Sequence, residues 1–567
     1  MSEKVFSTTK YRRLLYILSL ALILIALAVP RATNLDRFVT PDEPKWLHRS
    51  ANFLTALVQK DYKHTFQREH PGVTIMWASA AGFLVSNPDY VKSGPGQLER
   101  IGDFHRFLKD IDIDPVSPLK ASRIISALGI IAVLFMALYY ARQVFGIPIA
   151  MLGFIFVAFN PFSIALTRLL HLDGMVSALM LLALLAMMAY LYRGRHFVDL
   201  IVSATAAGLS WLTKSPALFL LPFFCFLIII DLINHWREEK QIHRQHIWWT
   251  LKPIMIWSGI AALTFTIFFP AMWVAPLDTI HKIFVQAIVY ASEGHESSVF
   301  FNGAVYSDGV QNGWFYPVNY LWRATPLTII GLLLLMFAFI LRRKIHFKQD
   351  LQYSALVLIL FVVLYTTFMT MGVKKFDRYL LPVFAPLDIL AAVGWVTLLT
   401  GTYQILREKL GHSAFQRYFM IAIGVLLTGA LIWQSWGVMQ TAPYYLSYFN
   451  PLMGGSEHAP EVMMIGWGEG LDKAARHLNQ SSEAGTLRAM SWYYDGPFSY
   501  FFNGITLLEE YPINPDDLPK VDYIVIYIHQ LQRQLPSEEF LAFMDQQTLE
   551  HIVRIGGIPY AYIYRMY

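Results

Sequence analysis

The sequence has few charged residues and almost no cysteine. Only 15% of its 567 residues are charged and 55% are hydrophobic, whereas soluble domains of average composition carry roughly 25% charged residues. This composition excludes a disordered chain and an ordinary water-soluble enzyme. The single cysteine, Cys225, excludes a disulfide framework and any metal site built from several cysteines. A net charge of +5 is too small to indicate a nucleic-acid partner.

Long apolar runs account for most of the remaining sequence. A membrane-spanning helix needs about 20 mostly apolar residues. We expect about eleven such helices, at 14–30, 121–141, 147–166, 174–192, 197–213, 215–233, 251–270, 326–341, 351–372, 380–400 and 418–436. A shorter apolar run at 73–85 predicts an interfacial or partly buried helix. The sequence therefore predicts a polytopic α-helical membrane protein.

The positions of lysine and arginine indicate an orientation. Basic residues precede the first run, which we interpret as a retained helix, and most later ones fall in alternate loops. Because cytoplasmic loops are rich in these residues, we expect a cytoplasmic N-terminus and a location in the plasma membrane. The predicted parts are a transmembrane domain at 1–436, with large outer loops at 31–120 and 271–325, and a small extracytoplasmic α/β domain at 437–567. The run Tyr523–Ile528 predicts a strand in that domain, and 470–478 has a helical pattern.

Two clusters of polar residues lie in the first outer loop, and each contains a carboxylate. Asp42 and Glu43 stand between two prolines, directly after the first apolar run. Neighbouring carboxylates at a membrane surface could supply a general base or a metal ligand. The alternative is that Asp42 caps a helix over 45–58. Glu69 and His70 could bind a metal or contact a phosphate, although Pro71 also suits the first turn of a helix.

A third cluster, Arg168, His171 and Asp173, lies in a very short turn between two apolar runs. Charged groups at membrane depth are costly, so such a cluster indicates a functional role. A structural Arg168–Asp173 ion pair is the alternative. Lys214, between two further apolar runs, is either part of the same site or a residue that extends to the membrane surface.

Basic residues also occur on the side of the membrane where the charge bias predicts few. The run Lys374, Lys375, Phe376, Asp377 and Arg378 follows a predicted span on its outer side. A phosphate ligand would explain it, because arginine binds phosphate through two hydrogen bonds and lysine through a point charge. Attraction to anionic lipid head groups is the alternative. His295, with glutamates on both sides, lies in the second outer loop.

The order of these motifs resembles the GT-C glycosyltransferases, among them the polyprenyl-phosphate-dependent protein O-mannosyltransferases and the lipid A aminoarabinose transferases (glycosyltransferase family 39-like). The resemblance covers about residues 1–480. The matching segments are Pro41–Glu43, Glu69–Gly72, Arg168–Asp173, Leu212–Pro216, Lys375–Pro382, Tyr444–Pro451 and Gly466–Gly470. Family members often have a second proline where this chain has Gly72.

The resemblance implies a GT-C fold and the transfer, with inversion, of a sugar from a polyprenyl-phosphate donor to a hydroxyl of a protein, lipid or glycan acceptor on the outer face. It implies that Asp42 is the base, that Glu43 is its neighbour, and that Asp173 is a second carboxylate of the cavity. It places Lys214, Lys375, Arg378 and Arg168 toward the donor phosphate, with Glu69, His70, His171 and His295 elsewhere in the cavity. A divalent metal held by Glu69 and His295 stays open as a cofactor.

Two other functions are compatible with many spans and buried charges. The first is a transporter or flippase of a lipid-linked substrate, although such proteins are often built from repeated halves and the sequence shows no internal repeat. The second is a non-catalytic assembly subunit, against which the adjacent Asp42 and Glu43 argue. No sequence feature identifies the sugar or the acceptor.

Overall fold

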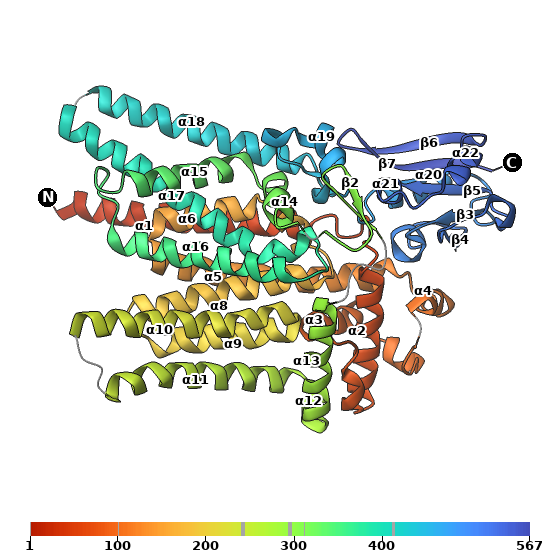
Figure 1. Ribbon diagram of the computed structural model, residues 1–567, viewed down its shortest axis with the longest axis horizontal. Coiled ribbons are helices and arrows are strands. Elements are labelled where there is room, and N and C mark those ends of the chain that lie inside the picture. Colours follow the sequence, from red (N-terminus) through yellow and green to blue (C-terminus); the bar gives the residue numbers. More distant parts are fainter. Residues whose placement is uncertain are drawn as a thin grey trace.

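The structure is a computed structural model that describes residues 2–99, 101–239, 244–292, 298–310, 312–410 and 414–566. Long helices lie side by side in a bundle, and a small sheet covers one end of it (Figure 1). The N-terminus lies at the opposite end of the bundle. This arrangement confirms the predicted fold class, a polytopic α-helical protein with a small C-terminal sheet region.

Eight helices in the described ranges are long and apolar enough to cross a membrane. They are α1 (Ser2–Ala32), α5 (Val116–Phe145), α8 (Leu172–Tyr192), α10 (Leu220–Glu239), α11 (Arg244–Phe268), α16 (Gln349–Met371), α17 (Leu381–Leu410) and α18 (Ala414–Met439). They support a multi-pass membrane protein. In the most apolar 18-residue stretch of α8, 94% is buried inside the protein, whereas in that of α18 only 6% is buried. Helix α8 therefore lies inside the bundle and α18 at its edge.

The other three predicted spans differ from single straight helices. Two are bent pairs: α6 (Ile147–Ala158) with α7 (Pro161–Thr167), bent by 67°, and α14 (Phe315–Arg323) with α15 (Pro326–Ile340), bent by 119°. Both bends precede a proline, which disfavours helical backbone in the residue before it. The third, α9 (Phe197–Thr213), has 17 residues and is shorter than a full span. Counting each bent pair as one gives up to ten spans, fewer than the eleven expected.

The two large loops form short helices across one end of the bundle. The first contains α2 (Glu43–Val58), α3 (Val73–Ser86) and α4 (Ile101–Asp110). The second contains α12 (Ala271–Val274), α13 (Pro276–Ser292), β1 (Val299–Phe301) and β2 (Ala304–Tyr306). In Figure 1, α2, α12 and α13 run nearly at right angles to the long helices, at the same end as the sheet. The apolar run at 73–85 is the helix α3, as predicted.

The C-terminal region is a mixed five-stranded sheet with short helices. Its strands are ordered β4 (Ile505–Leu508), β3 (Arg488–Ser491), β5 (Tyr523–Tyr527), β7 (Ile558–Arg565) and β6 (Thr548–Ile555). The strand β3 is parallel to both of its neighbours, and the other pairs are antiparallel. The helices are α19 (Gly455–Val462), α20 (Leu471–Leu478), α21 (Ile528–Gln532) and α22 (Glu538–Met544). The predicted strand at Tyr523–Ile528 is β5, which is buried along its whole length.

Candidate active site

Asp42 lies where the first outer loop meets α2, with its side chain directed to two other elements. It occupies the N-cap position of α2 but makes no side-chain capping hydrogen bond, so capping does not explain the carboxylate. Its Oδ2 lies 3.5 Å from His171 Nε2 and 3.5 Å from Arg378 Nη2. Three segments far apart in the sequence therefore meet at this carboxylate.

Asp173, in the first turn of α8, is the second carboxylate of this centre. Its Oδ1 accepts a hydrogen bond of 2.6 Å from Lys214 Nζ. Its Oδ2 lies 3.2 Å from His171 Nδ1 and 3.5 Å from Arg378 Nε. His171 and Arg378 therefore bridge Asp42 and Asp173, and the four side chains form one cluster with Lys214 at its edge.

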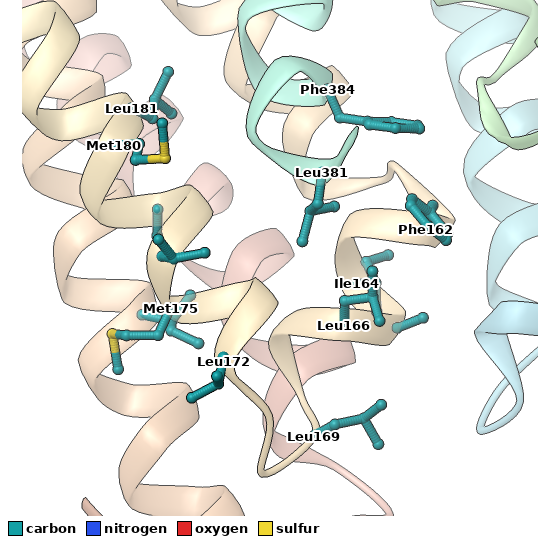
Figure 2. Packing of buried hydrophobic residues seen from close by; sticks show 14 of the residues in the cluster. Phe162, Ile164, Leu166, Leu169, Leu172, Met175, Met180, Leu181, Leu381 and Phe384 are labelled. Carbon is teal, nitrogen blue, oxygen red and sulfur yellow. The ribbon is translucent and has the colours of Figure 1, made fainter. Parts of the chain in front are cut away.

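The turn between α7 and α8 is held by tight packing. His171 has extended backbone at the N-cap of α8, and its Nδ1 lies 3.4 Å from the Asp173 amide nitrogen. A Cβ on Gly174 would lie 2.5 Å from the Leu166 carbonyl oxygen, so the close approach of α8 to the end of α7 requires glycine. Buried apolar residues of α7, α8 and α17 lie near the turn (Figure 2), among them Leu166, Leu172 and Leu381. This packing fixes the positions of the polar side chains.

Trp467 completes the centre. Its segment, Gly466–Gly470, was among those that carry the family resemblance, but Trp467 itself was not predicted as a site residue. Its ring lies 4.5 Å from the Arg378 guanidinium and meets His171 edge-on at 5.1 Å. Gly468 has φ +104°, and a Cβ there would lie 2.2 Å from the Val39 carbonyl oxygen. The alternation of glycines around a tryptophan was the available signal, because such glycines permit close contact between backbone segments.

Charge interactions set the protonation of the loop residues. Burial alone raises the pKa of Asp42, but the contact with His171 and the charge of Arg378 outweigh it and hold this pKa well below its usual range. Burial lowers the pKa of His171, and the neighbouring Asp173 and Asp42 reverse this and raise it. The cluster therefore contains an ionised Asp42 beside a histidine that favours its cationic form.

Glu43 follows Asp42 in sequence but is fully buried in a different environment. Its carboxylate accepts from Arg123 Nε at 2.6 Å, from the Thr40 amide at 2.9 Å and from the Leu170 amide at 2.8 Å. These bonds tie the first outer loop to α5 and to the α7–α8 turn. The geometry supports a positioning role for Glu43 beside Asp42 rather than contact with a substrate.

His70 and Gly72 bring the first loop next to Lys214. His70 Nδ1 lies 3.4 Å from Ser215 Oγ, and the Gly72 amide donates to the Thr213 carbonyl at 3.2 Å. Burial and the charge of Lys214 lower the pKa of His70 to about 3, so its ring is neutral near pH 7. The prediction that Pro71 lies in the first turn of a helix is wrong, because α3 begins at Val73 after Gly72.

Two other predicted site residues lie elsewhere. Arg168 donates to the carbonyls of Thr33 and Asn34 at 2.6 and 2.9 Å and fixes the end of α1. The alternative Arg168–Asp173 ion pair is therefore wrong, because Asp173 pairs with Lys214. Lys375 is buried and donates to the Val310 carbonyl at 2.9 Å.

Of the two residues considered for a metal, the structure describes only Glu69. Glu69 Oε2 lies 3.2 Å from Arg68 Nε, and His295 lies outside the described residues. Asp42 and Asp173 are already surrounded by Lys214, Arg378 and His171, a positive environment that opposes a divalent cation. Over the described ranges, no group of three or more His, Cys, Asp and Glu side chains has the geometry of a metal site.

One part of the chain matches a known protein family. Residues 117–273 match the family described as dolichyl-phosphate-mannose-protein mannosyltransferase. This region includes Asp173 and Lys214 and excludes Asp42 and Arg378. No curated protein gives a significant match to the sequence.

Several solved structures are similar to the chain. ArnT from Cupriavidus metallidurans in the apo state has 14% identity and a TM-score of 0.47, over 98% of each chain. The same protein bound to undecaprenyl phosphate has 14% identity and a TM-score of 0.44, over 97% of each chain. The apo oligosaccharyltransferase of Archaeoglobus fulgidus has 11% identity and a TM-score of 0.44, over 92% of this chain and 70% of that one.

Proposed function

We propose that this chain is an integral-membrane glycosyltransferase that moves a sugar from a polyprenyl-phosphate donor to an acceptor hydroxyl, on the outer face of the membrane. The observation that carries the proposal is the pairing of Asp42 and Asp173 through Arg378, with Lys214 beside them. The matched family supports the donor class, because its description names a sugar linked to a polyprenyl phosphate.

In this proposal Asp42 is the general base. Its carboxylate accepts the proton of the acceptor hydroxyl while that oxygen attacks C1 of the sugar. The bond from C1 to the phosphate oxygen breaks, a new glycosidic bond forms on the opposite face of the sugar, and the polyprenyl phosphate leaves as an anion. The side chain of Asp42 is 26% exposed, whereas that of Asp173 is 3% exposed, so Asp42 is the carboxylate that an acceptor can reach.

Arg378 and Lys214 stabilise the phosphate that departs. The Arg378 guanidinium lies on the rings of Phe376 and Trp467, at 4.1 and 4.5 Å, which holds its plane in place. Positioned cations that face a developing negative charge are among the largest contributions to catalysis. A donor phosphate would also draw Arg378 away from Asp42. The pKa of Asp42 would then rise toward its usual value, which makes it a stronger base when the donor is bound.

The test compares Asp42→Asn with Asp36→Asn, using purified protein and radiolabelled polyprenyl-phosphate sugars. Asp36 belongs to the same loop, but it is exposed and pairs with Lys120 at 3.3 Å, which makes it a matched control. We expect sugar release to water or to an added membrane extract to fall at least about 100-fold in Asp42→Asn. Release should be unchanged in Asp36→Asn.

Two results would overturn the proposal. Full sugar release by Asp42→Asn would remove the base from the mechanism. The absence of release with every donor, from wild-type protein that is folded and binds the lipid, would favour a transporter of a lipid-linked substrate. Melting temperatures and polyprenyl-phosphate binding of both variants separate loss of chemistry from loss of structure.

A further inference from the structure

A cavity lies between the C-terminal end of α18 and the C-terminal sheet, away from the candidate active site. Its volume is about 660 Å³. Its walls come from three parts of the chain: the segment after α1, the end of α18 with the loop that follows it, and the C-terminal region at α20 and the turn between β6 and β7. None of the residues that form the Asp42 centre lines this cavity.

The lining of this cavity is strongly basic. It includes four cationic side chains, Arg37, Lys473, Arg476 and Arg554, and no carboxylate among its lining residues in the described part of the chain. Two acidic residues lie next to these cations: Asp472, 3.5 Å from Arg476, and Asp36, which interacts with the charge of Arg37.

Four cations face two acidic neighbours, so positive charge is in excess. Asp472 is buried and also accepts a hydrogen bond from Tyr444 at 2.9 Å. Arg554 donates to the Gly557 carbonyl, and Lys473 lies over the Tyr444 ring. An uncharged carbonyl and an aromatic ring orient these cations without cancelling their charge. The excess of positive charge in a concave site fits an anion.

The position of the cavity next to α18 indicates which anion. Immediately before the lining residue Gly437, α18 presents Ile432, Trp433 and Trp436, which are 65%, 62% and 66% exposed. An apolar helix face with tryptophans near its end is typical of the boundary between hydrocarbon and head groups. In Figure 1, α18 lies along the edge of the bundle and ends beside the C-terminal region. A lipid whose chains follow α18 would place its head group at the cavity.

We propose that this cavity binds the phosphate of an anionic membrane lipid, at a site separate from the transfer centre. A volume of about 660 Å³ is sufficient for a phosphate head group. The backbone of Arg37 also connects the site to the rest of the loop, because its carbonyl accepts from Arg123, which holds Glu43. The proposal rests on the cavity and on the adjacent face of α18, and it is independent of the proposed transferase activity.

The test measures lipid binding by native mass spectrometry on detergent-purified full-length protein. Phosphatidylglycerol is the anionic probe and phosphatidylcholine the zwitterionic one. The double variant Lys473→Gln/Arg554→Gln is compared with Lys109→Gln/Lys520→Gln, which removes two exposed lysines outside the cavity. We expect phosphatidylglycerol to bind the first variant at least about tenfold more weakly than wild type, since each cation near the surface contributes to anionic-lipid affinity. Binding to the control variant should equal that to wild type.

Three outcomes would overturn this proposal. Equal phosphatidylglycerol binding by wild type and both variants would remove the site. If inorganic phosphate binds the cavity and phosphatidylglycerol does not compete with it, the ligand is a soluble phosphate and not a lipid. If Lys473→Gln/Arg554→Gln loses polyprenyl-phosphate binding and keeps phosphatidylglycerol binding, the cavity belongs to the donor site.

Discussion

Arg123 and Glu43 form a buried ion pair that joins α5 to the first turn of α2. Arg123 is 2% exposed and Glu43 is 0% exposed, and the guanidinium donates to both carboxylate oxygens. The same guanidinium donates to the carbonyls of Leu35 and Phe38, at 2.7 and 3.0 Å. The segment that carries Asp42 is thus fixed at several points by one side chain.

The first prediction concerns this pair. Glu43→Gln should lower the free energy of unfolding by about 3 kcal/mol, because it leaves the Arg123 charge buried without a counter-charge. The measurement is the melting temperature of the purified protein. Asp42→Asn serves as the comparison and should lower the melting temperature much less. A Glu43→Gln protein with wild-type stability and no transfer activity would instead assign Glu43 to the chemistry.

The second prediction concerns Gly72, where relatives often have proline. Gly72 has φ +60°, and a Cβ there would lie 2.2 Å from a Trp46 ring carbon. Gly72→Ala should therefore cost about 2 kcal/mol or more, from backbone strain and overpacking together. Gly94→Ala is the matched control, since Gly94 has φ +59° and no atom within 4 Å of the added Cβ. Equal melting temperatures for the two variants would contradict the prediction.

The third prediction is a dependence of stability on pH. His171 lies between Asp42 and Asp173, which raise its pKa above the usual value. A raised pKa in the folded state stabilises the protein fully below about pH 6.5, the unfolded value, and this contribution disappears as the pH rises through the folded value. The stability difference between wild type and His171→Gln should therefore be largest at acidic pH and shrink toward pH 9.

The measurement is thermal unfolding of both proteins between pH 5.5 and 9. A difference of one pKa unit between the folded and unfolded states corresponds to about 1.4 kcal/mol of unfolding free energy. His64→Gln is the control, because the side chain of His64 is 60% exposed and its ion-pair partner, Asp61, is not part of this cluster. A difference between wild type and His171→Gln that is constant with pH would show that His171 is held by packing alone.

The fourth prediction concerns Trp467. Trp467→Ala should lower the transfer rate by about tenfold, because Arg378 loses the ring that orients its guanidinium. Trp467→Phe should recover part of this rate, since a smaller ring keeps an aromatic face. The rates are compared at saturating donor, with melting temperatures recorded for each variant. Trp314→Ala, which removes a tryptophan that is 70% exposed, should leave the rate unchanged.

Much of the architecture followed from local sequence properties. Each predicted span coincides with one helix or one bent pair, because hydropathy is summed over consecutive residues. The bends at Pro161 and Pro326 were not predicted, because hydropathy summed along the chain does not report a change in helix direction. The strand at β5 was also predictable, since a short continuous apolar run is typical of a strand whose two faces are both covered. The boundary at residue 437 and the orientation in the membrane stay predictions.

The sequence by itself determined which polar residues stand at the ends of apolar helices, and this placed Asp42, Asp173, Lys214 and Arg378 among the candidates. Only the tertiary structure decided how they are paired, because Asp42 and Arg378 are 336 positions apart. It also separated Asp42 from Glu43, which are adjacent in sequence but face different elements.

Only the tertiary structure placed Trp467 against Arg378. It also showed that Lys375 and Arg168 donate hydrogen bonds to backbone carbonyls. The physical reason is that hydropathy depends on neighbours along the chain, whereas the partner of a charge depends on neighbours in space.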